Sequence, residues 1–264
     1  MKKNWNLNSK LSQVFLVLIL FISACSDPVV RDIYQLKIYT LEDENQELRI
    51  DKFLKDAFIP AAKRTGISHV GVFKPVEEDT LAGKLIDVLI PFSSISDFEK
   101  FGACLQDDMV YQSDGKDYIG AGHKDPPYKR IESVLLRSFK TMPEYGVPTH
   151  ATPNDEQIYE LRSYQGATEK LYEKKVEMFT EGGETSLFID LDFQPIFFGE
   201  VISGSAMPNL MYLTTFESKE SQAEYWDVFR SSPVWEALKK DEQYKHTVSH
   251  IDKFYLHPTA YSDL

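Results

Sequence analysis

The chain has 264 residues, 42% of them apolar and 27% charged, and its 41 acidic and 29 basic residues give a net charge of −12. This balance is typical of a globular protein and excludes a disordered chain, which could not bury enough apolar surface to offset its ordering entropy. It also argues against nucleic acid as a partner, because phosphate contacts need clustered Lys and Arg. Two cysteines are too few for a disulfide scaffold.

Residues 1–24 are predicted to be a signal peptide. Met1–Lys10 carries three lysines and no acid, and the apolar run Val14–Ile22 is too short for a transmembrane anchor. The following Ile22-Ser23-Ala24-Cys25 resembles the lipobox of bacterial lipoproteins. The resemblance implies acyl chains on Cys25 that anchor the protein to a membrane, with the folded domain outside the cytoplasm in the cell envelope, in the periplasm or at the outer membrane. An ordinary secretory signal with an unrelated cysteine is the alternative.

Residues 31–141 are predicted to form a repeat of the order strand, helix, strand, strand, helix, strand. The spacing of apolar residues predicts strands at 34–39, 68–75, 84–91 and 132–139, and helices at 46–64 and 96–105. The segment 106–129 is expected to be a long loop, either functional or merely mobile. Cys104 lies in the apolar helix before that loop and is expected to be a small buried hydrophobe rather than a nucleophile.

Residues 142–155 contain three prolines and are predicted to link this repeat to a second one at residues 156–264. The second repeat has the same order of elements. Strands are predicted at 157–164, 194–203, 210–216 and 247–256, and helices at 168–179, 184–190 and from 218 to 238. Gly182 and Gly183 are expected to break the chain between the first two of these helices.

The two repeats share residues at a constant offset of 125 positions. Ile33, Tyr34, Leu36 and Tyr39 recur as Ile158, Tyr159, Leu161 and Tyr164. A period this long fits two copies of one small domain rather than a solenoid. Each copy would be a ferredoxin-like βαββαβ unit. Because a single copy leaves one sheet face uncovered, we expect an α+β fold in which the two sheets face each other and form a barrel-like core.

The second repeat resembles the NIPSNAP domain. The resemblance is carried by residues 198–216, by Tyr225-Trp226-Asp227-Val228-Phe229 with Pro233-Val234-Trp235, and by residues 256–262. Residues 127–139 are similar to the first half of bacterial two-copy members. The resemblance implies a dimeric α/β barrel within one chain and brings no settled reaction, cofactor or catalytic residues. Many members carry Arg where Gln222 stands, so an arginine-dependent anion site at that helix is in doubt.

Glu200 is the acid of greatest interest, because it lies within the apolar strand segment Phe197–Val201. If its side chain faces the barrel interior, burial should favour the protonated carboxyl group, which would suit a general base or a polar ligand anchor. The alternative is an outward side chain paired with a lysine. His69, Tyr34, Tyr159 and Tyr212 are the other candidates for lining the same pocket.

Established catalytic motifs are absent from the sequence: it has no nucleophile elbow, phosphate loop, dinucleotide fingerprint or zinc-protease motif. No catalytic residue, metal ligand or cofactor is therefore predicted. The first hypothesis is a lipid-anchored envelope protein that binds a small molecule or a protein partner without catalysis. The second is a monooxygenase-like or haem-handling enzyme with its active site between the two sheets, which rests on fold analogy alone. The third is a structural envelope protein, and assembly into a homo-oligomer stays open.

Overall fold

The computed structural model describes residues 29–150, 152–153 and 156–264. The predicted signal peptide and Cys25 lie outside these residues. Within the described part of the chain, no helix is both long enough and apolar enough to cross a membrane.

The first half follows the predicted order of elements. Its elements are β1 (Ile33–Thr40), α1 (Glu44–Phe53), the π-helical turn η1 (Leu54–Phe58), α2 (Ile59–Arg64), β2 (Gly71–Pro75), β3 (Leu85–Phe92), α3 (Ile95–Asp107), α4 (Met109–Asp114), α5 (Lys116–Ile119) and β4 (Arg130–Ser138). The helix predicted at 46–64 is thus α1 and α2 joined through a π-helical turn.

The second half repeats this order. Its elements are β5 (Ile158–Gln165), α6 (Glu169–Phe179), α7 (Glu184–Asp190), β6 (Gln194–Ser203), β7 (Asn209–Phe216), α8 (Lys219–Ser231), α9 (Pro233–Leu238), the 3-10 turn η2 (Glu242–Tyr244) and β8 (His250–Pro258). The first residues of α1 and α6, Glu44 and Glu169, lie 125 residues apart, and so do Ile59 and Glu184, which begin α2 and α7. The offset seen in the sequence therefore recurs in the positions of the elements.

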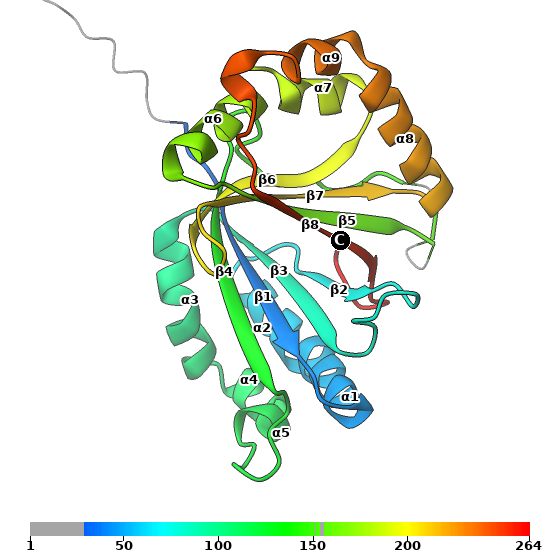
Figure 1. The fold of residues 1–264 in the computed structure, drawn as a ribbon. Coiled ribbons are helices and arrows are strands. Elements are labelled where there is room, and N and C mark those ends of the chain that lie inside the picture. The colour runs from blue at the N-terminus through cyan, green and yellow to red at the C-terminus, as the bar shows by residue number, and fades with distance from the viewer. Residues whose placement is uncertain (1–28, 151, 154–155) are drawn as a thin grey trace, which may run out of the picture.

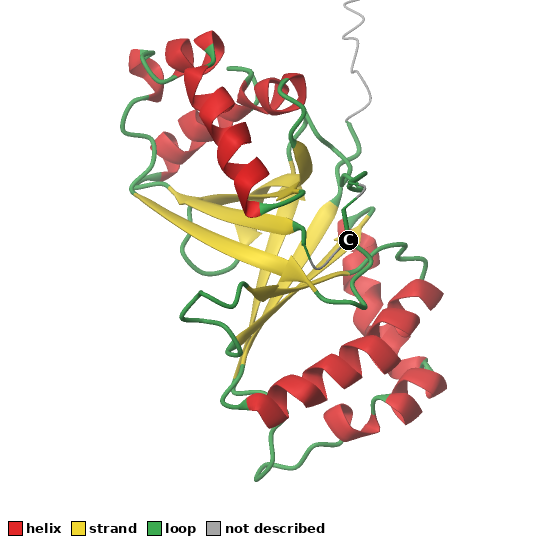
Figure 2. Cartoon of the chain, turned by 90° about the vertical axis from the view of Figure 1, so that its right-hand side faces the viewer, coloured by secondary structure: helices red, strands yellow, loops and turns green. Residues whose placement is uncertain are grey.

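The eight strands form a closed barrel in the order β1-β3-β2-β8-β5-β7-β6-β4, with antiparallel pairing throughout. Each half supplies four neighbouring strands in an equivalent order, β4-β1-β3-β2 and β8-β5-β7-β6. The halves meet at two short seams, where β2 pairs with β8 over three positions and β4 with β6 over four. The two sheets cross in Figure 1, and Figure 2 shows the strands between two separate groups of helices, one from each half.

Local sequence signals set where the helices begin. The Thr168 side chain accepts a hydrogen bond from the backbone of Leu171 at the start of α6, and Ser218 and Ser221 form a reciprocal capping box at the start of α8. Gly183 has a φ of +87° immediately before α7, a conformation that a residue with a Cβ rarely adopts. The predicted break at Gly182 and Gly183 is confirmed.

Alternate strand residues point into the barrel, and side chains fill its interior. Tyr34 and Tyr159, at corresponding places in the two halves, belong to one buried cluster between the sheets. The Tyr34 ring centroid lies 5.0 Å from that of Phe197, and the Tyr159 ring centroid lies 4.8 Å from that of Phe73. Leu264, only 4% exposed, joins the same cluster. The space between the two sheets is therefore a packed core.

Two expectations for the first half were wrong. The segment 106–129 is not a plain loop, because it contains α4 and α5, and the second half has α9 and η2 at the corresponding places. Cys104 is exposed rather than buried. The apolar side of α3 is formed by Phe98, Phe101 and Leu105, and Cys104 lies about 100° around the helix from Leu105.

Candidate functional site

The structure does not bring the five predicted pocket residues into one cavity. Tyr34 and Tyr159 face the barrel interior, as expected, but they lie in the packed core. Burial raises the pKa of Tyr159 to about 12 and also raises the pKa of Tyr34. His69 lies just before β2, and its Nδ1 is 2.7 Å from the hydroxyl of Tyr145, in the segment that follows β4.

The Glu200 side chain points out of the barrel, which is the alternative orientation given in the sequence analysis. A β-bulge causes this orientation: the register of β6 against β7 shifts between Pro195 and Phe197, and Ile196 and Phe197 both face inward. After the bulge, residues that would otherwise face inward face outward, and residues that would otherwise face outward face inward. Glu200 pairs with Arg31 rather than with a lysine, at 3.0 Å from Oε1 to Nη1, beside a cleft of about 600 Å³.

Tyr212 lies on the outer face of β7, beneath the helices of the second half, and not in the barrel interior. Its hydroxyl is 3.1 Å from that of Tyr164 on β5. Burial and the neighbouring Tyr164 raise the pKa of Tyr212 well above its ordinary value. The two tyrosines belong to a group that we call the Arg162 network: Glu160, Arg162, Tyr164, Tyr212, Gln222 and Trp226.

Glu160 is the acid at the centre of the Arg162 network and is fully buried. Its carboxylate accepts hydrogen bonds from Nε of Arg162 at 2.6 Å, from Nε2 of Gln222 at 2.8 Å and from Nε1 of Trp226 at 2.6 Å. Gln222 and Trp226 are one turn apart on α8, so both reach the same carboxylate. These donors compensate a charge that would be very costly to bury alone.

The guanidinium of Arg162 stacks on an aromatic ring while its edge forms hydrogen bonds. Its central carbon lies 3.7 Å from the centroid of Trp226, and its Nη1 donates to the Tyr164 hydroxyl at 3.3 Å. Nε and Nη2 both contact Glu160. Three of the five N–H donors of Arg162 are therefore used by residues in the described part of the chain, and two remain for another acceptor.

A second buried ion pair adjoins the Arg162 network. Nζ of Lys175 on α6 is 2.8 Å from Oε2 of Glu184 at the start of α7, and both residues are almost completely buried. The same ammonium group lies 4.5 Å from the ring centroid of Phe179 and 5.4 Å from that of Tyr164. The second half thus holds two carboxylates and two cations beneath its helices, with no net charge.

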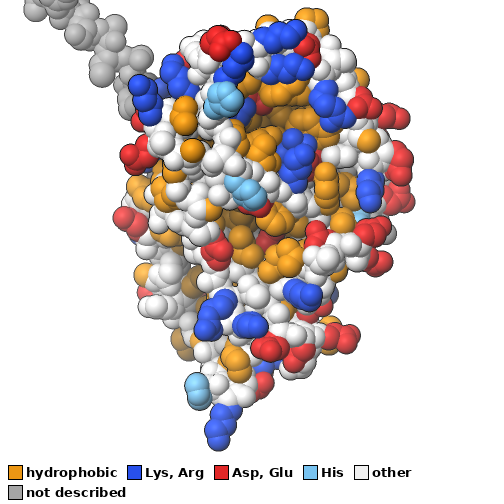
Figure 3. All heavy atoms as spheres, viewed as in Figure 1, with side chains coloured by type: hydrophobic (Ala, Val, Ile, Leu, Met, Phe, Trp, Pro, Cys, Tyr) orange, Lys and Arg blue, Asp and Glu red, His pale blue; other side chains and the backbone are white. Residues whose placement is uncertain are grey.

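The molecular surface is hollowed on this side of the second half. Figure 3 shows the hollow between α6 and α8, with hydrophobic walls and a basic side chain within it. A pocket of about 350 Å³ adjoins the network and is lined in part by Ile158, Ser218, Tyr255 and His257. Tyr255 is the direct cross-strand neighbour of Glu160. A small molecule could therefore approach the network from this side.

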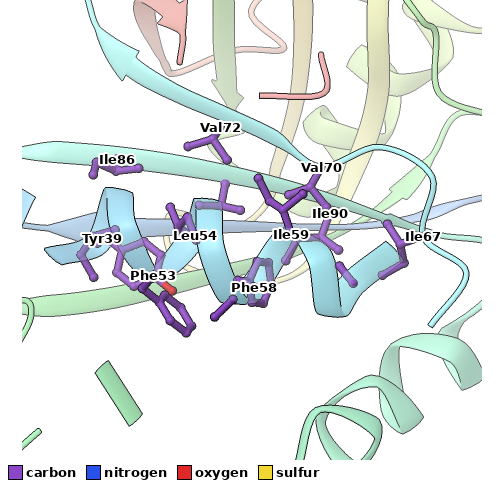
Figure 4. Close-up of a cluster of buried hydrophobic side chains, with 14 of the residues drawn as sticks. Tyr39, Phe53, Leu54, Phe58, Ile59, Ile67, Val70, Val72, Ile86 and Ile90 are labelled. Atoms are coloured by element: carbon purple, nitrogen blue, oxygen red, sulfur yellow. The ribbon is translucent and has the colours of Figure 1, made fainter. Parts of the chain in front are cut away.

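The first half has no such pair of charges at the corresponding positions. Gln35 stands 125 residues before Glu160, Ile50 before Lys175 and Ile59 before Glu184. Ile50 and Ile59 both belong to the apolar cluster of the first half, and Figure 4 shows Ile59 among its side chains. The same arrangement of strands and helices therefore forms without these buried charges.

No prediction from the sequence singled out Glu160, Arg162, Lys175 or Glu184. A signal for three of them was available, since Glu160, Lys175 and Glu184 replace neutral residues when the repeats are compared at the 125-residue offset. Among the described residues, no group of three or more His, Cys, Asp or Glu side chains could hold a metal ion.

A comparison with known families finds a match in the half of the chain that contains the Arg162 network. The family model NIPSNAP matches residues 159–263. Residues 159–263 thus match a NIPSNAP domain. All six residues of the Arg162 network, together with Lys175 and Glu184, lie within it. A search of curated proteins finds no match.

Two solved structures share the fold over most of the chain, and a third is similar over less than half of it. A proposed monooxygenase from Lactobacillus acidophilus is 11% identical, with a TM-score of 0.58, over 86% of this chain and 94% of its own. A proposed monooxygenase from Fusobacterium nucleatum is 8% identical, with a TM-score of 0.56, over 88% of this chain and 94% of its own. A NIPSNAP family protein from Agrobacterium tumefaciens is 18% identical, with a TM-score of 0.37, over 46% of this chain and 98% of its own.

Proposed function

We propose that this protein binds a small molecule over the Arg162 network of its NIPSNAP domain, without catalysing a reaction. The observation that carries the proposal is the contrast between the two halves: the second buries two ion pairs that the same fold omits in the first. Buried ion pairs contribute little to stability compared with well-packed apolar residues, so their presence favours a role in function. A deep, partly aromatic site with a few polar groups is typical of small-molecule binding.

The chemistry of the site favours a planar, mostly apolar ligand with an acceptor oxygen, such as a carbonyl or carboxylate group. Tyr164, Trp235 and Tyr255 are partly buried and supply aromatic surface. The two remaining N–H groups of Arg162 would donate hydrogen bonds to this oxygen. A guanidinium suits such acceptors because its donors are planar and fixed.

The enzyme hypothesis would place an active site between the two sheets. Structural neighbours described as proposed monooxygenases support it by fold alone, because their identity to this chain is 8–11%. In the described part of the chain, Tyr34, Phe197 and Leu264 help to fill that space. We therefore propose the binding site outside the barrel. We also propose that the two halves are duplicated ferredoxin-like repeats, which form a dimeric α/β barrel within one chain.

We propose further that acyl chains on Cys25 hold the protein at the cell envelope. The lipobox-like sequence before Cys25 supports this proposal. Two or more acyl chains give stable membrane attachment where one gives only marginal binding. A Cys25→Ala variant should move from the membrane fraction to the soluble fraction, and its mass should lack the acyl chains. Equal membrane attachment of both proteins would contradict the proposal.

Native mass spectrometry of the full chain tests the binding proposal. The protein, incubated with an extract of its host cells, should carry one adduct per chain. Arg162→Lys keeps the charge but loses the fork of donors and the stacked plane, so adduct occupancy should fall about tenfold or more. Lys37→Arg, at the corresponding position of the first half, is the matched control and should retain the adduct. Equal occupancy in both variants would exclude Arg162 from the site.

A further inference from the structure

A second cation stands beside the Arg162 network on the outer face of the barrel. Lys253 of β8 is the direct cross-strand partner of Arg162 on β5. Residues opposite each other in an antiparallel pair point to the same face of the sheet, with their Cβ atoms about 5 Å apart. Phe254 and Leu256 of β8 pack in the cluster between the sheets. Because strand residues alternate in direction, Lys253 and Tyr255 point outward, as Arg162 does.

The ammonium group of Lys253 has no partner of its own. Lys253 is exposed, and within the described part of the chain its side chain forms no ion pair and no hydrogen bond. Glu160 balances the charge of Arg162, so these three side chains leave one positive charge in excess. The chain as a whole is acidic, with a net charge of −12. A negative group on a bound molecule would balance the excess and relieve the repulsion between cations on facing strand positions.

The first half of the chain lacks this pair of cations. Lys37 stands at the position that corresponds to Arg162, and its cross-strand partner is Ser133 on β4. In the order of the strands, β4 lies beside β1 as β8 lies beside β5. The fold therefore does not require a second cation at this place. The second half has one beside a buried guanidinium that keeps two N–H donors for another acceptor.

We infer that the site binds an apolar monocarboxylic acid, with its carboxylate held between Arg162 and Lys253. The inference rests on the proposed function and narrows its ligand from any acceptor oxygen to an anionic one. The two remaining N–H groups of Arg162 would donate to the carboxylate, and the Lys253 ammonium would add a charge-assisted contact.

The pocket that adjoins the network limits the rest of the ligand. Tyr255, two residues from Lys253 on the same face of β8, lines this pocket and offers an aromatic surface to an apolar body. The charged residues that line the pocket are three acids, Glu78, Glu156 and Glu220, and one lysine, Lys219. On balance they would repel a second carboxylate, so a single negative group at the Arg162 end fits best.

Isothermal titration of the full chain with 4-phenylbutanoate and with its neutral amide, 4-phenylbutanamide, tests the inference. One acid should bind per chain, about tenfold or more tighter than the amide, because only the acid forms charge-assisted contacts. Lys253→Gln should weaken binding of the acid about tenfold and leave that of the amide unchanged. Lys55→Gln removes the same charge from an exposed position in the first half and should change neither affinity.

Three results would overturn the inference. The first is no heat of binding with millimolar acid. The second is equal affinity of wild type for acid and amide, and if Arg162→Lys then weakens both, the proposed function stands while this inference fails. The third is an equal loss of acid binding in Lys253→Gln and Lys55→Gln, which would show attraction to the overall charge. A failure of the proposed function would appear separately, as a bare wild-type chain in the mass-spectrometric experiment.

Discussion

Replacing Lys175 by Ile should lower the free energy of unfolding by about 3–5 kcal/mol, because Glu184 would be left buried without its partner. Replacing both Lys175 and Glu184 by Ile should leave stability unchanged or raise it by about 1–4 kcal/mol. The double variant reproduces the pair Ile50 and Ile59, which the first half already packs in its apolar cluster. The first half of the same chain thus serves as the reference for replacing the ion pair by two isoleucines.

Urea unfolding followed by circular dichroism measures both effects. Lys174→Ile is the matched control, because Lys174 neighbours Lys175 on α6 and its ion pair with Glu177 is partly exposed. Its stability should change far less than that of the Lys175 single variant. A double variant as unstable as the single variant would show that the fold of the second half requires these charges, and the contrast between the halves would then carry no functional argument.

Asp87→Asn should change how the stability of the protein depends on pH. Asp87 points into the barrel from β3, is 5% exposed, and its Oδ1 has no hydrogen-bond partner among the described residues. Burial, and then the charge of Glu132, raise its pKa from 3.8 to about 7. Between pH 3.8 and about 7, Asp87 is protonated in the folded protein and ionised in the unfolded chain. Stability should therefore fall as the pH rises from about 4 to about 7.

The variant should lose this component of the pH dependence. One pKa unit corresponds to about 1.4 kcal/mol. The free energy of unfolding of the variant, minus that of wild type, should therefore be up to about 4 kcal/mol larger at pH 8 than at pH 4. Urea unfolding at a series of pH values measures the effect. Asp107→Asn, at the exposed end of α3, should keep the wild-type dependence. Parallel curves for wild type and Asp87→Asn would show that Asp87 is ionised throughout this range.

The sequence predicted the elements well because each depends on local signals. The alternation of Tyr34 and Leu36 with polar residues, the cap at Thr168 and the break at Gly183 act within a few residues of chain. The offset between repeats also made the arrangement of two facing sheets predictable. The burial of Cys104 was wrongly predicted because consecutive residues of a helix lie about 100° apart. That single step is enough to separate the apolar side of α3 from its exposed side.

The direction of strand side chains in the site could not be predicted in the same way. A single extra residue at the bulge near Ile196 turns Glu200 outward, and the sequence does not show where a register shift falls. Glu160 acquires its donors Gln222 and Trp226 from a helix more than 60 residues later in the chain, so its burial depends on the docking of α8. The comparison between the two repeats is the signal that could have identified it.

Native mass spectrometry of the wild-type chain beside the Lys175→Ile, Glu184→Ile double variant tests the central claim most directly. Both proteins should show the same secondary structure by circular dichroism. After incubation with the same cell extract, the wild type should carry one adduct per chain, and the double variant should have lost most of it. An adduct of equal occupancy on both proteins, or a bare wild-type chain, would contradict a ligand site built on the buried charges of the NIPSNAP domain.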